Sequence, residues 1–287
     1  MVNHEKVYRF ARMLAGGGPA DTPAQARALV ADLRTQALRA PDIVADATGL
    51  MGEQSPDVKV VDRPTWAAAA AVWIDTMLPG KDVLDTFQGS LVLPAVSTKV
   101  LGQFDPFAEP ARLYLVAPNI SAFRAAYDLD RRDLSLWVTV HEFTHAVQFA
   151  AAPWLRGLLM SKASELCDAL GEDSAHGLLD DVTAVMSLLE GHAEYVMNNV
   201  PVTHIRSRQR IVDAMAAQRA AANPVANLLL TRLGLPDKRR QYAAGESFVA
   251  GVVGRRGMEF FNRVWQRPEN LPTQAELSDP DAWIERV

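Results

Sequence analysis

Apolar residues recur at helical spacing along most of the chain, and proline and glycine mark where the predicted helices begin and end. Thr22-Pro23 predicts the start of a helix over 24–39, which Pro41 ends before a shorter helical segment reaches Gly49. The same reasoning predicts helices over 65–77, 119–128, 134–149, 154–170, 178–199, 206–221, 238–253 and 257–266.

Strand signals are few and short. Val58–Asp62 reads as a short strand, and Arg112–Pro118 is the best strand candidate, one that would offer an edge to an extended peptide. Gly102–Phe107 is expected to be a loop, and Thr273–Glu276 has the spacing of a helix-capping box. The pattern therefore predicts a mainly α fold (α+β) with a few short strands.

The predicted helix over 134–149 carries a His-Glu-x-x-His motif, with Glu142 between His141 and His145. Residues four apart on an α-helix have Cβ atoms about 5–6 Å apart. Both imidazoles can therefore bind one ion, each at about 2.0–2.1 Å from zinc. Glu142 points away from the line that joins the histidines, where it can act as the general base toward a metal-activated water. An apolar helix gains little from burying three ionisable groups together, which favours metal binding over a structural role.

A hydrolytic zinc site needs a third protein ligand and an open fourth position. Glu190 and Glu194 are spaced i, i+4 on an otherwise apolar predicted helix, so both can face the histidines. We predict that Glu190 is the third ligand and that Glu194 accepts a hydrogen bond from the far nitrogen of a ligand histidine. Two alternatives stay open, namely Glu194 as the ligand with the roles exchanged, or His192 as the ligand. Otherwise His192 is expected to be solvated or to support a ligand.

Composition limits the class of protein. The chain has 287 residues, of which 49% are hydrophobic and 22% charged, as expected for a globular protein with a sizeable core. A net charge of −5 argues against nucleic acid as a partner. The one cysteine, Cys167, cannot form an internal disulfide, and the longest apolar run, Trp66–Ile74, is too short to cross a bilayer. The start lacks the apolar segment of a secretion signal, so we expect a cytoplasmic protein with no membrane partner.

The motifs resemble those of known metallopeptidases. His141-Glu-x-x-His145 with Glu190-x-x-x-Glu194 resembles the gluzincins, in which the downstream glutamate binds zinc and a later acidic residue supports a histidine. Glu190-Gly-His-Ala-Glu-Tyr195 is similar to the Glu-Gly-x-Ala-x-Tyr element of their aminopeptidase branch. The separation between His145 and Glu190 is longer than usual there, so the fold need not be that of thermolysin.

A closer resemblance covers nearly the whole chain. It is carried by Val61–Pro64, Val100–Asp105, Leu115–Asn119, His141–Phe149, Pro153–Arg156, Leu189–Glu194 and Pro268–Thr273. These segments resemble the actinobacterial zincin-like metallopeptidase type 2 family, first catalogued as candidate hydrolases, one branch of which is named for deazaflavin coenzyme biosynthesis. The resemblance implies a zincin-like helical domain of unproven substrate. With no repeat or linker visible, we predict one zincin-like metallohydrolase domain over 1–287, with an N-terminal helical part at about 1–80 and a metal-site core at about 110–255.

The function that these residues predict is zinc-dependent hydrolysis, as in a metallopeptidase that cleaves an amide bond. Zn²⁺ on His141, His145 and Glu190 would lower the pKa of its water toward roughly 7. Glu142 would take that proton and return it to the leaving amine. Tyr242, with Tyr195 in reserve, is the candidate donor to the oxyanion. The alternatives are a non-catalytic accessory protein stabilised by zinc, and a hydrolase of a non-peptide amide or ester. The sequence leaves open the substrate, endo- or exo-action and the oligomeric state.

Overall fold

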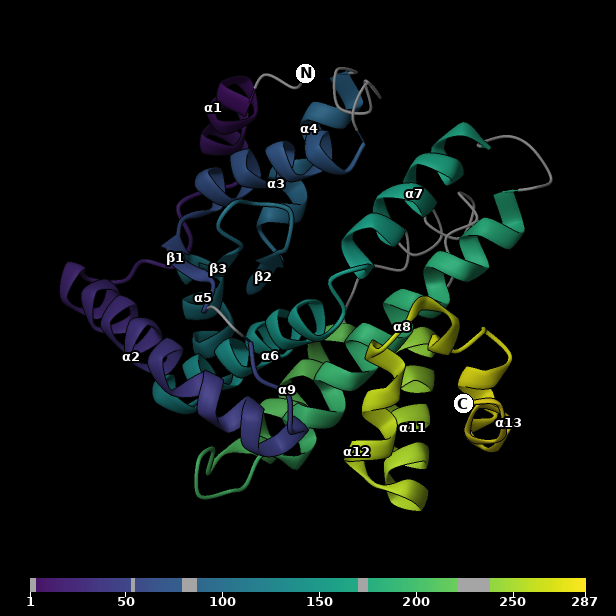
Figure 1. Ribbon diagram of the computed structural model, residues 1–287. Coiled ribbons are helices and arrows are strands. Elements are labelled where there is room, and N and C mark those ends of the chain that lie inside the picture. The colour runs from purple at the N-terminus through teal and green to yellow at the C-terminus, as the bar shows by residue number, and fades with distance from the viewer. Residues whose placement is uncertain (1–3, 53–54, 79–86, 170–174, 221–237) are drawn as a thin grey trace.

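The computed structural model describes residues 4–52, 55–78, 87–169, 175–220 and 238–287. Most of these residues are helical (Figure 1), in α1 (His4–Leu14), α2 (Pro23–Thr48), α3 (Arg63–Met77), α4 (Phe87–Ser97), α5 (Ala117–Tyr127), α6 (Arg131–Ala151), α7 (Leu155–Asp168), α8 (Ala175–Asn199), α9 (Arg208–Ala220), α11 (Lys238–Arg256), α12 (Met258–Phe261) and α13 (Pro280–Arg286). Short 3-10 turns are η1 (Asn262–Trp265), η2 (Pro268–Asn270) and η3 (Glu276–Ser278). The strands are β1 (Asp57–Val61), β2 (Gly102–Asp105) and β3 (Arg112–Val116). The predicted mainly α fold with a few short strands is confirmed.

The three strands form one small sheet in the order β1-β3-β2. β1 runs parallel to β3, and β2 runs antiparallel to it, with Phe104 opposite Leu113. The loop predicted over Gly102–Phe107 is therefore wrong over its first four residues, which form β2. The strand predicted over Arg112–Pro118 is confirmed over its first five residues, and because β3 is paired on both sides it offers no edge to an extended peptide. Leu113 and Leu115 are fully buried, as is typical of a central strand.

Helix α2 continues through Pro41, so the predicted end of the helix at that proline is wrong. The prolyl ring costs a backbone hydrogen bond, but Ala37 and Val44 on either side are buried in the core, where α2 packs against α6. The start of α2 is as predicted. The Thr22 side chain accepts from the Gln25 backbone, and the Gln25 side chain accepts from Thr22 in return, so both bonds of the capping box are present.

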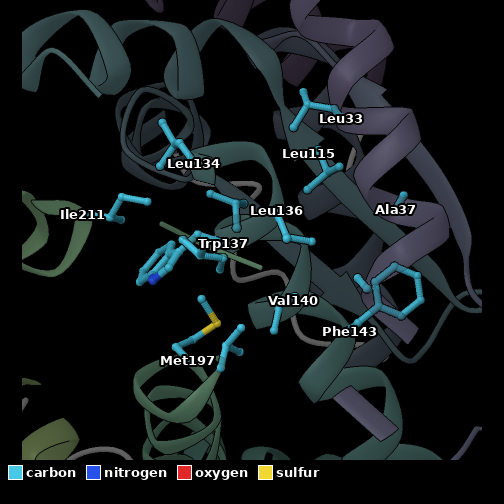
Figure 2. Close-up of a cluster of buried hydrophobic side chains, with 14 of the residues drawn as sticks. Leu33, Ala37, Leu115, Leu134, Leu136, Trp137, Val140, Phe143, Met197 and Ile211 are labelled. Atoms are coloured by element: carbon cyan, nitrogen blue, oxygen red, sulfur yellow. The ribbon is translucent and has the colours of Figure 1, made fainter. Parts of the chain in front are cut away.

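Buried hydrophobic side chains gather in three clusters. The first joins α2, β3, α5, α6 and α9 to the C-terminal end of α8 (Figure 2). The second joins the middle of α8 to α7, α11, α13 and the turns that precede α13. The third lies among α1, α3, α4 and β3. Helix α8 thus belongs to two clusters, and it packs against α6 and against α11 (Figure 1). The assignment of 1–287 to one domain stays a prediction.

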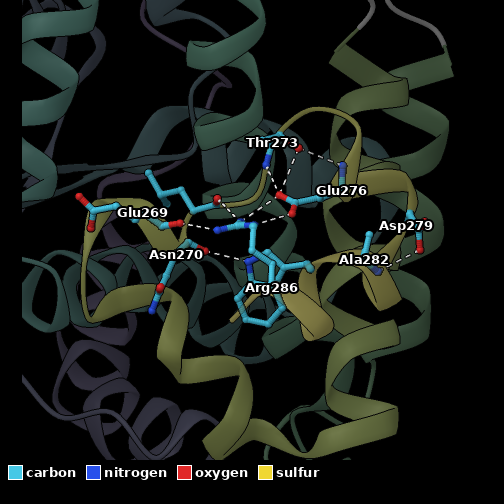
Figure 3. A network of polar contacts seen from close by, with 9 residues as sticks. Glu269, Asn270, Thr273, Glu276, Asp279, Ala282 and Arg286 are labelled. Atoms are coloured by element: carbon cyan, nitrogen blue, oxygen red, sulfur yellow. Dashed lines mark hydrogen bonds and ion pairs between the residues drawn. The ribbon is translucent and has the colours of Figure 1, made fainter.

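The C-terminal segment is fastened beside α11 by a network of polar contacts around Arg286 (Figure 3). Its guanidinium contacts the Glu276 carboxylate at 2.6 Å and donates to the Leu271 carbonyl oxygen at 2.9 Å. Glu276 also completes the capping box predicted with Thr273. The network holds the fully buried Trp283 in the second cluster. Within the described residues no helix combines the length and the apolarity needed to cross a membrane.

Two glycines allow α8 and α11 to cross at close range. A Cβ atom built on Gly191 would lie 2.2 Å from the carbonyl carbon of Gly245, and one built on Gly245 would lie 1.9 Å from the carbonyl oxygen of Ser187. Real Cβ atoms do not approach backbone this closely, so any larger residue must push the two helices apart. Since Gly191 follows Glu190 directly, this crossing also fixes the part of α8 that carries the predicted third ligand.

We expect Gly191→Ala to lower the free energy of unfolding by about 3 kcal/mol or more, because backbone on both sides leaves no space for the methyl group. Gly157→Ala on α7 is the control, since a Cβ there meets nothing within 4 Å. That change should raise the free energy of unfolding by about 0.5–1 kcal/mol through helix propensity. Urea titrations with a chelator present measure both values without any contribution from bound metal. Equal effects of the two substitutions would contradict the close crossing.

Candidate metal centre

Helix α6 presents the two histidines of the motif on one face. Its N-cap is Asp130, whose side chain accepts from the backbone of Arg132 and Asp133 at 2.9 Å each. The rings of His141 and His145 have centroids 4.9 Å apart and are nearly perpendicular. This is the arrangement expected for residues four apart on a helix.

Glu190 comes to these histidines from α8. One carboxylate oxygen lies 3.6 Å from His141 Nε2, and the other lies 3.8 Å from His145 Nε2. Two ligand atoms of a tetrahedral zinc ion are about 3.3 Å apart, so the three side chains need only small movements to share one ion. The ligand atoms of the three side chains all lie within 4.8 Å of one another, close enough to hold one metal ion. Among the described residues, this is the group of His, Cys, Asp or Glu side chains that meets this condition. Two imidazoles and one carboxylate are a donor set that suits zinc.

The electrostatic field at His141, His145 and Glu190 favours a positive charge. Burial would lower the pKa of His141, but the hydrogen bond to Glu190 and the charges of Glu142, Glu190 and Glu194 outweigh burial and raise the pKa of His141 to about 9. The pKa of His145 is lowered, chiefly by burial and also by the charge on His141. Without a metal, a proton on His141 thus partly balances the nearby carboxylates. A divalent cation fits the site for the same reason.

Glu142 is held between α6 and the edge strand β2. Its side chain is buried, and a Cβ atom built on Gly102 would lie 2.6 Å from Glu142 Oε1. Burial raises the pKa of Glu142 to about 7, although the charge on His141 and a backbone hydrogen bond from Phe104 both act to lower it. The carboxyl group thus has a pKa near neutrality, as a group that accepts and returns a proton requires.

Gln148 is a residue that our sequence reasoning missed. It is fully buried on α6 and links three groups. Its side-chain nitrogen lies 2.9 Å from the Leu189 carbonyl oxygen and 3.0 Å from His192 Nδ1, and its side-chain oxygen lies 2.9 Å from His145 Nδ1. The signal that could have found it is its position three residues after His145 on the same helix, the spacing at which side chains meet.

One backbone carbonyl fixes the protonation of two histidines through this amide. The Leu189 oxygen can only accept, so the Gln148 nitrogen must donate to it, and the amide oxygen must face His145. That oxygen can only accept, so His145 carries its hydrogen on Nδ1. Its Nε2 lone pair is then free to point toward Glu190 and a cation. By the same logic the second hydrogen of the amide goes to His192 Nδ1.

His192 is fully buried, so the expectation that it is solvated is wrong. Its ring packs against Phe261 and Trp265, with centroid distances of 5.2 and 5.4 Å, and it does not belong to the group of close donors. Burial lowers the pKa of His192 to about 3. The ring is therefore neutral, and it supports the site through Gln148.

The other predicted residues lie as follows. Glu194 lines the same cavity as the donors, and its charge acts to raise the pKa of His141. His145 Nδ1 has Gln148 as its partner, and His141 Nδ1 has no hydrogen-bond partner among the described residues, so neither far nitrogen donates to Glu194 in the structure. A supporting role for Glu194 stays a prediction. Tyr195 packs against the second cluster and is not among the residues that line the cavity. The side chain of Tyr242 lies outside the described residues.

The candidate site opens into a cavity of about 570 Å³. His141, Glu142, His145 and Glu190 all line it. Its volume is in the range of small-molecule and peptide sites. The metal centre is therefore one wall of a ligand-sized space, as a catalytic metal requires and a purely structural metal does not.

Comparisons with known proteins agree with this geometry. A family model described as zincin-like metallopeptidase matches the chain over residues 2–89, 81–176 and 166–284. Among solved structures, the crystal structure of a protein from Chloroflexus aurantiacus, described as a candidate hydrolase with a novel fold, is 30% identical to this chain. The TM-score is 0.80, and the match covers 100% of this chain and 98% of that one. No curated protein matches the chain significantly.

We expect Gln148→Leu to weaken zinc binding by about 10- to 100-fold, because His145 loses the acceptor that fixes its tautomer. Competition with a chromophoric chelator measures the affinity. Gln36→Leu is the control, since Gln36 is also buried but bonds to Arg39 on α2, away from the histidines. Both variants should lose some stability, and only the first should lose zinc affinity. Unchanged affinity in Gln148→Leu would contradict the role assigned to the amide.

Proposed function

Because the chain belongs to the zincin-like metallopeptidase family, we propose that it is a zinc-dependent hydrolase that cleaves an amide bond, with a peptide or small amide as substrate. The observation that carries the proposal is the shared wall of the cavity, on which two imidazoles and a carboxylate converge beside a buried glutamate. The family and the candidate hydrolase that resembles this chain both support a metal-dependent hydrolase. On its motifs we also assign the chain to the actinobacterial type 2 branch, and on its single cysteine, Cys167, we assign it to the reducing cytoplasm.

In this proposal His141, His145 and Glu190 hold zinc. When bound, the ion supplies Lewis acidity, which lowers the pKa of water and polarises a carbonyl group. His145 offers its Nε2 lone pair because Gln148 keeps the hydrogen on Nδ1. Glu190 supplies one negative charge, and it comes from a helix that the α8–α11 crossing holds in place.

Glu142 is the general base. Its raised pKa lets the carboxylate take a proton from the attacking water at neutral pH and hold it without great cost. The same carboxyl group then returns the proton to the leaving amine. The Phe104 backbone donates a hydrogen bond to this carboxyl group, and Gly102, which has no side chain, leaves the space that the group occupies.

Two rival functions use the same residues. In an accessory protein the zinc would join α6 to α8 and no turnover would occur. Structural zinc sites, however, have four protein ligands, and the donor group found among the described residues has three. The second rival is hydrolysis of a non-peptide amide or an ester, which needs the same base and the same ligands and differs only in the substrate that the cavity accepts.

We expect Glu142→Gln to keep the fold and the zinc content of the wild-type protein and to lower kcat by at least about 10²-fold, because the amide cannot take the proton. Metal content by mass spectrometry and turnover of fluorogenic peptide and ester libraries measure both effects. His141→Ala is the companion variant, and it should lose zinc as well as activity. A wild-type protein that binds zinc and turns over none of these substrates would favour the accessory function.

We also expect Gly102→Ala to lower kcat by roughly 10- to 100-fold with zinc retained. The new methyl group would lie 2.6–2.9 Å from three atoms of the Glu142 side chain. That side chain is flexible and moves more easily than backbone, so the base is displaced while the fold is kept. Gly254→Ala on α11, where a Cβ meets nothing within 4 Å, is the control. Full activity of Gly102→Ala would show that the position of Glu142 is not critical.

A further inference from the structure

The cavity extends beyond the metal centre along α6. Phe149 lies one turn after His145, and its ring packs against Phe104 of β2 with centroids 5.8 Å apart. Beyond this pair, Phe107 packs edge-on against Trp73 of α3 at 6.2 Å. All of these residues line the cavity. The rings come from three separate elements, α3, α6 and the β2 region, so the fold builds this space from several parts.

Helices α7 and α8 complete this part of the cavity. Leu159 and Ala163 are one turn apart on α7, and Met186 lies one turn before Glu190 on α8. We call the space lined by Trp73, Phe104, Phe107, Phe149, Leu159, Ala163 and Met186 the aromatic arm. Phe107, Phe149 and Leu159 also belong to the second hydrophobic cluster, so the wall of the arm is backed by packed core.

Charge is unevenly distributed along the cavity. The three carboxylates that line it, Glu142, Glu190 and Glu194, lie at the metal centre, and none of the arm residues is charged. Lys99 also lines the cavity, and it is exposed to solvent. A charged group that entered the arm would lose its hydration without gaining a partner there. A large apolar group would instead leave water for a surface of rings and aliphatic side chains.

The arm begins at Phe149, one helical turn after the proposed zinc ligand His145. A side chain of the substrate that fills the arm therefore belongs to a residue beside the bond that is cleaved at the metal centre. We propose that the aromatic arm binds a large apolar side chain, aromatic or long aliphatic, of the residue next to the scissile amide. The substrate class is therefore short peptides or small amides that carry such a group. This inference rests on the proposed function and adds the feature by which that site selects its substrate.

The first test uses blocked short peptides that differ only in the residue next to the cleaved bond, with Phe, Leu, Ala, Asp or Lys at that position. The wild-type zinc protein should cleave the Phe and Leu peptides with kcat/KM about 10- to 100-fold above that of the Ala peptide, and should cleave the Asp and Lys peptides least. Equal rates across the series, or a preference for the charged residues, would overturn the proposal.

The second test fills the arm. Ala163→Phe places a ring in the arm from a half-buried position on α7. The variant should lose at least about tenfold in the ratio of kcat/KM on the Phe peptide to kcat/KM on the Ala peptide. Damage to the fold or the metal centre would lower both rates together, so this change of preference is specific. Ser161→Phe, on the exposed side of the same helix, is the matched control and should keep the wild-type preference.

Binding to the inactive Glu142→Gln protein separates the two proposals. Calorimetry with the Phe and Asp peptides should show tighter binding of the Phe peptide, and this advantage should disappear when Ala163→Phe is added. If this binding pattern is found and the wild-type protein cleaves none of the peptides, the role of the arm is confirmed and the hydrolase proposal is wrong. If cleavage occurs with no preference among the five peptides, the hydrolase proposal is confirmed and the role of the arm is wrong. If there is neither cleavage nor selective binding, both are wrong.

Discussion

The structure depends on the compensation of negative charge at one half-buried place. The charges of Glu142, Glu190 and Glu194 all act on His141, and the surrounding helices are mostly apolar. Carboxylates this close repel one another, and their partial burial limits the water that screens them. The raised pKa of His141 shows the result, because a proton is retained there to offset the carboxylates. A divalent cation carries twice the charge of that proton and relieves the same repulsion. The electrostatic energy of the site is therefore least favourable when the site holds neither a proton nor a cation.

The surrounding helices and strand β2 hold the histidines and the carboxylates close together. Helix α8 is seated against α11 through Gly191 and Gly245, and against α6 through the bond from Gln148 to the Leu189 carbonyl oxygen. Glu190 stands between these two contacts. Strand β2 limits Glu142 on the other side of α6. Two of the ligands and the base therefore lie on α6 and the third ligand lies on α8, and both helices are fixed by contacts within about one helical turn of these groups.

The sequence predicted what depends on local spacing. The His-Glu-x-x-His motif and the position of Glu190 are visible because a helix converts spacing along the chain into a shared face, and the capping boxes at Thr22 and Thr273 depend on residues only three apart. Other features depend on residues far apart in sequence. Helix α2 passes through Pro41 because its buried face packs on α6, and β2 forms because β3 is available as a partner. The aromatic arm joins Trp73 to Phe107 and Phe104 to Phe149, which no local pattern brings together.

The identity of residue 148 follows from the same charge balance. A glutamate there would also accept from His145 Nδ1, and more strongly, but it would add a fourth carboxylate to the cluster. It would also set an acceptor against the Leu189 carbonyl oxygen, which can only accept. A glutamine is neutral and offers one acceptor and two donors, which matches one donor and two acceptors at the observed distances. The amide that selects the tautomer of His145 thus also bonds α6 to α8, so one side chain contributes both to the geometry of the metal centre and to the packing of the two helices.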